Sequence, residues 1–151
     1  MARSPSSKPL ILALVGTDHH PFERLVRWVD AWAGTRAARV VVQHGSARPP
    51  EHAEGVRLLP VAELDELLQV ATAVVCHGGP GTIAAVRAAG RLPIVLGRDP
   101  ARGEHVDDHQ LRFAAAAGRA GEVRAVDSEA GLAAALDDAL ADPGGQRIGP
   151  G

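Results

Sequence analysis

Short apolar runs alternate with amphipathic stretches along almost the whole chain. Largely apolar runs closed by glycine, proline or polar residues are typical of strands buried on both faces, and they occupy residues 10–15, 39–43, 56–59, 72–76, 92–96 and 122–126. Between these runs apolar residues recur at helical spacing, and helices are expected over residues 22–30, 61–68, 80–89, 106–117 and 128–140. Strands that alternate with helices predict an α/β fold: a parallel sheet with helices on both faces.

The chain of 151 residues has the length of one domain. We expect that domain over residues 9–141, between a flexible N-terminus (1–8) and a flexible tail (142–151). Aromatic residues make up only 3% of the chain and the net charge is −2, which argues against a nucleic-acid-binding module. No apolar run reaches the roughly 18 residues of a membrane helix. With no signal peptide visible, the sequence predicts a soluble, cytoplasmic protein.

A glycine-rich turn connects the fourth apolar run to an alanine-rich helical stretch, in the sequence CHGGPGTIAA. Glycine lets a ligand approach the backbone closely, and Pro80 suits the first position of a helix. The free N–H groups and the positive dipole end of such a helix N-terminus bind phosphate or carboxylate. A tight turn without a ligand is the alternative, but three glycines in four positions favour an anion site. Cys76, at the strand end, is interpreted as a small buried hydrophobe rather than a nucleophile.

Three loops are expected to meet at one crevice. In an open parallel sheet, ligands bind at the carboxyl ends of the strands, near the point where the strand order reverses. The loops at residues 16–21, 77–82 and 97–109 follow such strand ends, and they are also the loops richest in Gly, His, Asp and Arg. Topology and composition therefore predict the same site.

The third of these loops, RDPARGEHVDDHQ over residues 98–110, allows more than one interpretation. Glu104 would suit the first turn of the following helix. His105 and His109 are four residues apart and with Asp108 suggest a metal site, but the H-E-x-x-H pattern and an evident third ligand are missing. The mixture of donors and acceptors favours recognition of sugar hydroxyls.

A nicotinamide-dependent oxidoreductase is a rival interpretation. Residues 79–84 satisfy the pattern G-x-G-x-x-A, and Asp99 lies 20 residues after Gly79. However, this fingerprint normally follows the first strand of its unit, and here it follows the fourth. The first strand ends instead in the sequence Gly-Thr-Asp at residues 16–18. Titration with NADH and UDP separates the two interpretations.

Several motifs together resemble one known family. The motif HGGPGT follows an apolar strand, GRLPIVL follows the next helix, and DDHQ lies at the start of the helix after that. In this order and spacing they resemble the C-terminal half of family-28 glycosyltransferases. LVGTDHHPFERLVRWVD near the N-terminus is similar to the opening of short, stand-alone members: the catalytic subunit of the split enzyme that adds the second N-acetylglucosamine to dolichol diphosphate, and bacterial exopolysaccharide counterparts.

The resemblance implies a Rossmann-like doubly wound parallel sheet, equivalent to the donor-binding half of a GT-B glycosyltransferase. It implies that the donor diphosphate is held by Gly16, Thr17, His77, Gly78, Gly79, Gly81 and Thr82. It also implies that the donor sugar is contacted by Glu104, His105, Asp108, His109 and Gln110. Backbone donors and a helix dipole suit the charge of a UDP leaving group, so we expect no metal and no cofactor beyond the UDP-sugar substrate. One departure concerns Ala85, because many relatives carry a ribose-binding Glu there.

By the same resemblance, the chain is expected to transfer a hexose from a UDP-sugar to a lipid-linked acceptor in polysaccharide or glycolipid biosynthesis. The acceptor would be bound by a separate, membrane-anchored subunit, which would bring the chain to the inner face of the membrane. His19 or His20 is the candidate catalytic base, because histidine titrates near neutrality, unless the partner supplies it. Arg98 or Arg102 would meet a carboxylate or phosphate of the ligand, or face solvent. A non-catalytic subunit that binds the nucleotide-sugar is the remaining alternative.

Overall fold

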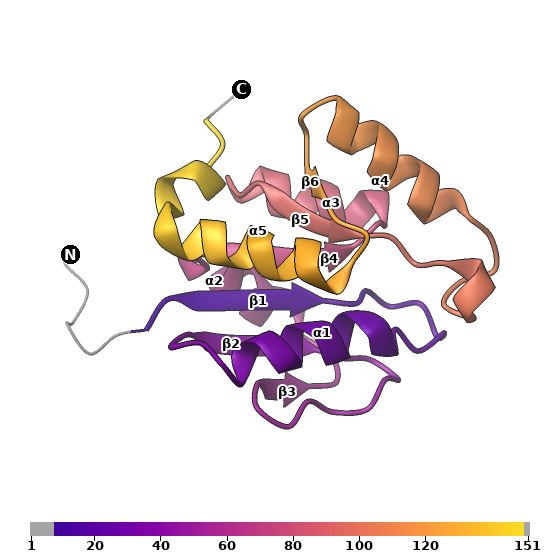
Figure 1. Ribbon diagram of the computed structural model, residues 1–151, viewed down its shortest axis with the longest axis horizontal. Helices are drawn as coiled ribbons and strands as arrows, with labels where there is room; N and C mark the ends of the chain where they lie inside the picture. The colour runs from indigo at the N-terminus through magenta and orange to yellow at the C-terminus, as the bar shows by residue number, and fades with distance from the viewer. Residues whose placement is uncertain (1–7, 150–151) are drawn as a thin grey trace.

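The computed structural model describes residues 8–149, which form a six-stranded parallel sheet between two layers of helices (Figure 1). The strands are β1 (Leu10–Leu14), β2 (Arg39–Gln43), β3 (Glu54–Val56), β4 (Ala73–His77), β5 (Pro93–Leu96) and β6 (Arg124–Ala125). The α-helices are α1 (Glu23–Ala33), α2 (Val61–Val70), α3 (Pro80–Ala88), α4 (His109–Arg119) and α5 (Glu129–Ala141). Short 3-10 helices occupy Pro100–Arg102 (η1) and Pro143–Gln146 (η2).

The strand order is β3-β2-β1-β4-β5-β6, and every adjacent pair is parallel. This is the doubly wound order, in which two mononucleotide-binding halves meet between β1 and β4. All residues of β1, β4 and β5 are buried, as expected for central strands covered on both faces. The predicted fold class is confirmed.

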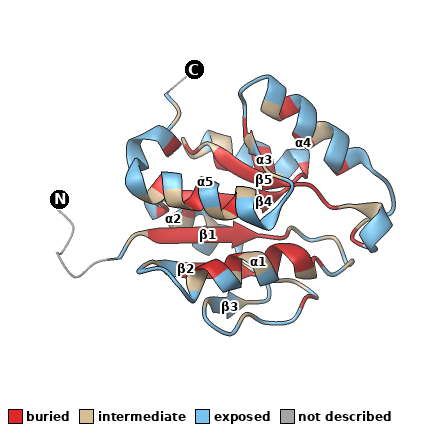
Figure 2. Cartoon of the chain, in the orientation of Figure 1, coloured by how far each residue is buried: buried red, intermediate tan, exposed pale blue. Residues whose placement is uncertain are grey.

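Two apolar cores lie on opposite faces of the sheet. Helices α1 and α5 contact each other and cover one face, where their buried residues pack against alternate residues of β1, β2 and β5. Helices α2, α3 and α4 cover the other face and bury the remaining strand residues. Figure 2 shows the central strands buried throughout, while the helices are buried only on the side that faces the sheet.

Three element boundaries differ from those expected. The third strand ends at Val56, because Leu58 and Leu59 leave the sheet and line a cavity instead. Helix α4 begins at His109 rather than at residue 106, since residues 106–108 form a bend. The last strand has only two residues, Arg124–Ala125.

The C-terminal segment that was expected to be flexible makes main-chain contacts with the domain as far as Ile148. Asp142 accepts a hydrogen bond from the Gly145 N–H at the start of η2. Gln146 is buried and its carbonyl accepts a bond from Leu92, while Ile148 donates to the Gly90 carbonyl. These contacts attach the segment to the turn before β5. The rest of this expected tail, residues 150–151, and residues 1–7 of the expected N-terminus lie outside the described residues.

Within residues 8–149, no helix is long and apolar enough to cross a membrane. The longest, α5, has 13 residues. Ser128 is its N-cap, because the Ser128 side chain accepts a hydrogen bond from the Gly131 N–H.

Candidate functional site

The candidate site lies at the carboxyl ends of β1 and β4, the two paired strands in the middle of the sheet. Helix α3 begins directly after β4, with Gly79 as its N-cap and Pro80 as its first residue. The N–H groups of Gly81 and Thr82 in the first turn have no intrahelical acceptor. A Cβ on Gly81 would meet open space. The helix therefore presents free donors and its positive dipole end to the open side of the crevice.

The His77 ring fills the space beneath this turn. The residue is 7% exposed, and its Nε2 lies 3.0 Å from Thr82 Oγ1. A Cβ on Gly16 or on Gly79 would lie 2.3 Å from a ring atom, and Gly16 has a φ of +84° as well. Both positions are thus restricted to glycine by the imidazole. Gly81 leaves room for a ligand, whereas Gly16 and Gly79 leave room for His77.

The His77 imidazole is neutral at physiological pH. Burial, together with the nearby positive charge of Arg98, lowers its pKa to about 4. A histidine in the unfolded chain titrates near 6.5, so the unfolded state binds this proton first as the pH falls. The folded protein is therefore expected to lose up to about 3 kcal/mol of stability between about pH 6.5 and pH 4.

The variant His77→Gln should lack this part of the pH dependence. Urea unfolding of wild type and variant at about pH 7 and about pH 4.5 measures it. The loss of stability between the two pH values should be clearly smaller in the variant. An equal loss in both proteins would show that another group is responsible.

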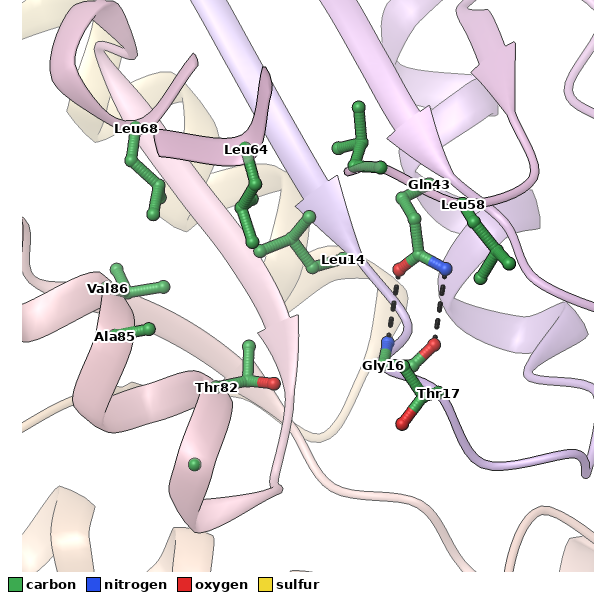
Figure 3. A pocket seen from close by; sticks show the side chains of 12 residues that line it. Leu14, Gly16, Thr17, Gln43, Leu58, Leu64, Leu68, Thr82, Ala85 and Val86 are labelled. Atoms are coloured by element: carbon green, nitrogen blue, oxygen red, sulfur yellow. Dashed lines mark hydrogen bonds between the residues drawn. The ribbon is translucent and has the colours of Figure 1, made fainter. Parts of the chain in front are cut away.

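A cavity of about 200 Å³ opens beside the start of α3 (Figure 3). Gly16 and Thr17, after β1, and Gly81 and Thr82, in α3, contribute its polar groups together with Gln43. Its apolar walls are Leu14, Leu58, Leu59, Leu64, Leu68, Ala85 and Val86. An apolar cavity with a few convergent polar groups is the usual form of a small-molecule site. Four of the residues expected at the donor diphosphate therefore line one cavity.

The Gln43 side chain fixes the loop that follows β1. Its Oε1 accepts hydrogen bonds from the N–H groups of Val15 (3.1 Å) and Gly16 (3.2 Å). Its Nε2 donates to the carbonyls of Gly16 (3.2 Å) and Arg57 (3.0 Å). Figure 3 shows the amide hydrogen-bonded to Gly16 through both its oxygen and its nitrogen. This residue was missed from the sequence, although a polar residue that closes an apolar strand at the ligand-binding edge was the available signal.

Gln110 and Gly78 were both expected to contact the donor, but their polar groups bond to each other. The buried Gln110 Oε1 accepts from the N–H groups of Gly78 (3.1 Å) and Arg98 (3.3 Å). A Cβ on Gly78 or on Gly97 would lie within 3.0 Å of the Gln110 backbone oxygen. These glycines let the start of α4 approach the ends of β4 and β5. Gln110 thus positions the turn, and the Gly78 N–H is already paired.

Arg98 was expected to face a ligand or solvent, and it is completely buried instead. Its Nη1 donates to the carbonyls of His20 (2.6 Å) and Glu104 (2.9 Å), and its Nη2 donates to Val15 (2.6 Å). Burial lowers its pKa, while the carboxylates of Asp18 and Glu104 oppose that shift. An arginine keeps its charge in proteins. A fixed positive charge therefore lies beneath the crevice and joins its two outer loops.

Glu104 lies inside the third loop rather than at the crevice. It is 4% exposed, and its two oxygens accept from Arg24 Nη2 (2.9 Å) and Nε (3.2 Å). Oε1 also accepts from the Asp99 N–H. Glu104 was expected to contact the donor sugar; in the structure its carboxylate is used in this buried ion pair, which ties the loop after β5 to α1.

The rest of the third loop divides into two parts. Asp108 and His109 are exposed at the start of α4, where Asp108 Oδ1 accepts from Arg112 Nε at 2.9 Å. Neither residue lines the cavity. His105 instead contacts the loop after β1, where its Nε2 lies 3.3 Å from Asp18 Oδ2. Among residues 8–149, no shared metal site is formed by His105, Asp108 and His109, because their ligand atoms do not lie close enough together.

The two candidate catalytic histidines lie in the loop after β1. His20 is half-buried and its Nδ1 lies 2.6 Å from Asp18 Oδ1, while His19 is exposed. The two rings are 4.2 Å apart between centroids. Among the described residues, one group of histidine, cysteine and acidic side chains lies close enough to hold a metal ion: Asp18, His19 and His20.

Two other sequence interpretations concern Cys76 and Asp99. Cys76 is fully buried, as expected of a small hydrophobe, and burial raises the pKa of its thiol to about 12. Asp99 accepts from the Ala101 N–H at 2.9 Å and caps η1, so its side chain is already used within the loop. The fingerprint itself follows β4, not the first strand of the sheet.

The chain matches the model of the glycosyltransferase family 28 C-terminal domain over residues 10–145. No curated protein matches the chain.

Several solved glycosyltransferases have a similar fold. The chain aligns with the glycotransferase of kitacinnamycin (TM-score 0.69, 20% identity), covering 95% of this chain and 38% of that one. It aligns with CalG4, the calicheamicin glycosyltransferase (TM-score 0.67, 19% identity), covering 95% of this chain and 38% of that one. It aligns with MurG of Acinetobacter baumannii (TM-score 0.58, 20% identity), covering 92% of this chain and 43% of that one. The chain thus spans less than half the length of each, and at this identity the likeness concerns the fold.

Proposed function

Because the chain belongs to glycosyltransferase family 28, as a C-terminal domain of that family, we propose that it is the donor-binding, catalytic subunit of a hexosyltransferase. The donor in this proposal is a UDP-sugar. The fold is that of the C-terminal half of GT-B glycosyltransferases.

One observation carries the proposal: the cavity joins an anion-binding helix N-terminus to an apolar interior. The N–H groups of Gly81 and Thr82 suit the diphosphate of a nucleotide-sugar. The leucine walls beside them suit the flat, weakly polar face of a nucleobase. Thr17, exposed at the rim, can hydrogen-bond the polar edge of the ligand. A nucleotide likewise has a charged end, its phosphates, and a flat end, its base.

The same arrangement suits the departure of UDP without a metal ion or cofactor. Negative charge develops on the diphosphate as the glycosidic bond breaks. Preorganised backbone donors and a helix dipole stabilise such charge without rearrangement. The buried guanidinium of Arg98 adds a fixed positive charge beneath the crevice.

Ala85 offers a direct test of how the nucleotide lies. It is exposed and lines the cavity one helical turn after Thr82, in the position where many relatives carry a ribose-binding Glu. In Ala85→Glu the new carboxylate is expected to bond the ribose hydroxyls and to tighten UDP binding by about 10-fold, which corresponds to one added charge-assisted hydrogen bond. Calorimetric titration with UDP measures this effect. The control is Ala88→Glu, at an exposed position of the same helix that does not line the cavity. Equal affinities in both variants would contradict this orientation.

The acceptor in our proposal is lipid-linked, and a separate membrane-anchored subunit binds it, as in the split enzymes that the N-terminal motif resembles. The subunit would hold the chain at the inner face of the membrane. The product would then belong to a polysaccharide or glycolipid.

The proposal is tested in two steps. Thermal-shift measurements of the purified chain with UDP-glucose, UDP-N-acetylglucosamine and UDP-glucuronic acid are expected to show stabilisation by a UDP-sugar, because a ligand that binds only the folded state raises stability. Transfer of radiolabelled sugar is then measured in membranes of the source cell, with and without the chain. Binding without any contribution to transfer would favour the non-catalytic alternative, and turnover by the purified chain with a lipid acceptor alone would contradict the need for a partner.

A further inference from the structure

We propose that Asp18, His19 and His20, in the loop after β1, bind a divalent transition-metal ion such as Zn²⁺, with His105 from the loop after β5 as the fourth ligand. None of these four residues lines the cavity beside α3. The inference therefore goes beyond the proposed function and does not depend on it. It also leaves the proposed departure of UDP without a metal ion unchanged, because the diphosphate is placed at the start of α3.

The three neighbouring side chains bring their ligand atoms close together. One carboxylate oxygen of Asp18 and one ring nitrogen each of His19 and His20 all lie within 4.8 Å of one another. The rings of the two histidines are 4.2 Å apart between centroids. Ligand atoms on a tetrahedral Zn²⁺ lie about 3.4 Å from each other, because each is about 2.1 Å from the ion. Small side-chain movements therefore suffice to surround an ion.

His105 adds a third imidazole from a distant part of the sequence. Its Nε2 lies 3.3 Å from Asp18 Oδ2, while the other oxygen of that carboxylate faces His20. Its buried Nδ1 has no hydrogen-bond partner among the described residues and lies 3.6 Å from Asp107 Oδ1. A histidine that ligates a metal through one nitrogen usually donates its other N–H to a carboxylate or carbonyl. Asp107 is in place for that second role.

The main chain holds the ligands in place before an ion binds. Asp18 Oδ1 accepts from the His20 main-chain N–H at 2.8 Å. The His20 carbonyl accepts from Arg98 Nη1 at 2.6 Å, and the His19 carbonyl accepts from Ser46 Oγ at 2.9 Å. Ligands that are already ordered lower the entropy that binding costs.

The ion would replace the hydrogen bond between Asp18 and the His20 ring, whose Nδ1 lies 2.6 Å from Asp18 Oδ1. An aspartate is ionised at neutral pH and can only accept, so Nδ1 carries the ring proton in the structure. When Nδ1 binds the ion, the neutral ring keeps its one proton on Nε2. The side chain of His20 is 23% exposed and that of Asp18 is 24% exposed, so an ion can reach both from solvent.

The donor set selects the kind of ion. Imidazole nitrogens suit Zn²⁺, Cu²⁺ and Ni²⁺, whereas Mg²⁺ and Ca²⁺ need mainly oxygen ligands. Only one carboxylate, that of Asp18, belongs to the set, and the guanidinium of Arg98 brings a positive charge close to it. The affinity for Zn²⁺ is therefore expected to be micromolar, weaker than that of a closed structural zinc site. A bound ion would join the loops after β1 and β5.

The test is calorimetric titration of the purified chain, without an affinity tag and freed of metal, with ZnCl₂. We expect saturable binding of one Zn²⁺ per chain. At about 100 times the dissociation constant, Zn²⁺ should raise the unfolding temperature by about 5–10 °C, and Mg²⁺ at the same concentration should not. His52→Ala, at an exposed histidine on the loop after β2, is the matched control and should bind Zn²⁺ like wild type.

Variants of the four residues identify the ligands. His19→Ala and His20→Gln should each weaken Zn²⁺ binding at least about 100-fold, and His105→Gln by at least about 10-fold. His19 is exposed, so His19→Ala should unfold at the wild-type temperature without metal, which separates a lost ligand from a lost fold. Wild-type affinity in His19→Ala or His20→Gln would overturn the site, as would wild type that does not bind Zn²⁺. Wild-type affinity in His105→Gln would overturn the fourth ligand. UDP titration of the same wild-type chain tests the proposed function separately.

Discussion

Replacing Arg98 with methionine is expected to lower the free energy of unfolding by about 3–5 kcal/mol, the usual effect of breaking a buried charged network. The guanidinium is fully buried and supplies the donors for the carbonyls of Val15, His20 and Glu104. Methionine fills a similar volume but leaves these oxygens without a partner. Because they belong to the loops after β1 and β5, both loops should loosen and UDP binding should weaken with them.

Urea unfolding and UDP titration of Arg98→Met measure the two effects. Arg102→Met is the matched control: this arginine is mostly exposed and lies 3.7 Å from Asp99. A surface change of that kind should alter stability by no more than about 0.5 kcal/mol. Equal stabilities of the two variants would show that Arg98 does not hold the loops together.

Replacing Gly81 with aspartate is expected to weaken UDP binding at least about 100-fold, because a carboxylate near a diphosphate costs several kcal/mol at the effective dielectric of a protein surface. The fold should tolerate the change. Gly81 is exposed, and its Cβ would enter open space. An acidic residue in the first turn also suits the helix dipole. The variant therefore separates ligand binding from folding.

Calorimetric titration with UDP, together with thermal unfolding without ligand, checks this prediction. Gly81→Ala, which adds a methyl group but no charge, is the control and should lose far less affinity. If Gly81→Asp unfolds at the wild-type temperature and still binds UDP with wild-type affinity, the diphosphate does not bind at the start of α3.

Much of the fold could be predicted from local patterns. Apolar runs became the central strands, and the strand-to-helix turn at Pro80 begins a helix as expected. The exceptions have tertiary causes. Leu58 and Leu59 satisfy a strand pattern, yet they line the cavity, since α2 and α3 offer them an apolar surface.

The candidate site could be predicted in position but not in the direction of every side chain. The edge of the sheet and the start of α3 follow from topology and turn chemistry. In the third loop, however, Glu104 pairs with Arg24, 80 residues earlier, and Arg98 bonds to Val15, 83 residues earlier. A local sequence pattern contains no information on such distant partners. Glu104, expected at the donor sugar, and Arg98, expected at an anionic group of the ligand or in solvent, both hold the loops in place.

The roles of His77 and of the two glycines against its ring, Gly16 and Gly79, also depend on packing. The sequence predicts glycines that admit a ligand, and at Gly81 there is open space. At Gly16 and Gly79 the missing Cβ instead makes room for an imidazole buried beneath the turn. Only the three-dimensional arrangement distinguishes a glycine needed for a ligand from one needed for a neighbouring ring.

We propose that the cavity beside α3 binds a uridine nucleotide. Titration of the purified wild-type chain with UDP and, in a separate experiment, with NADH tests this most directly, with the heat of binding recorded. We expect saturable binding of UDP at one site per chain and no binding of NADH. Saturable binding of NADH without binding of UDP would contradict the proposal.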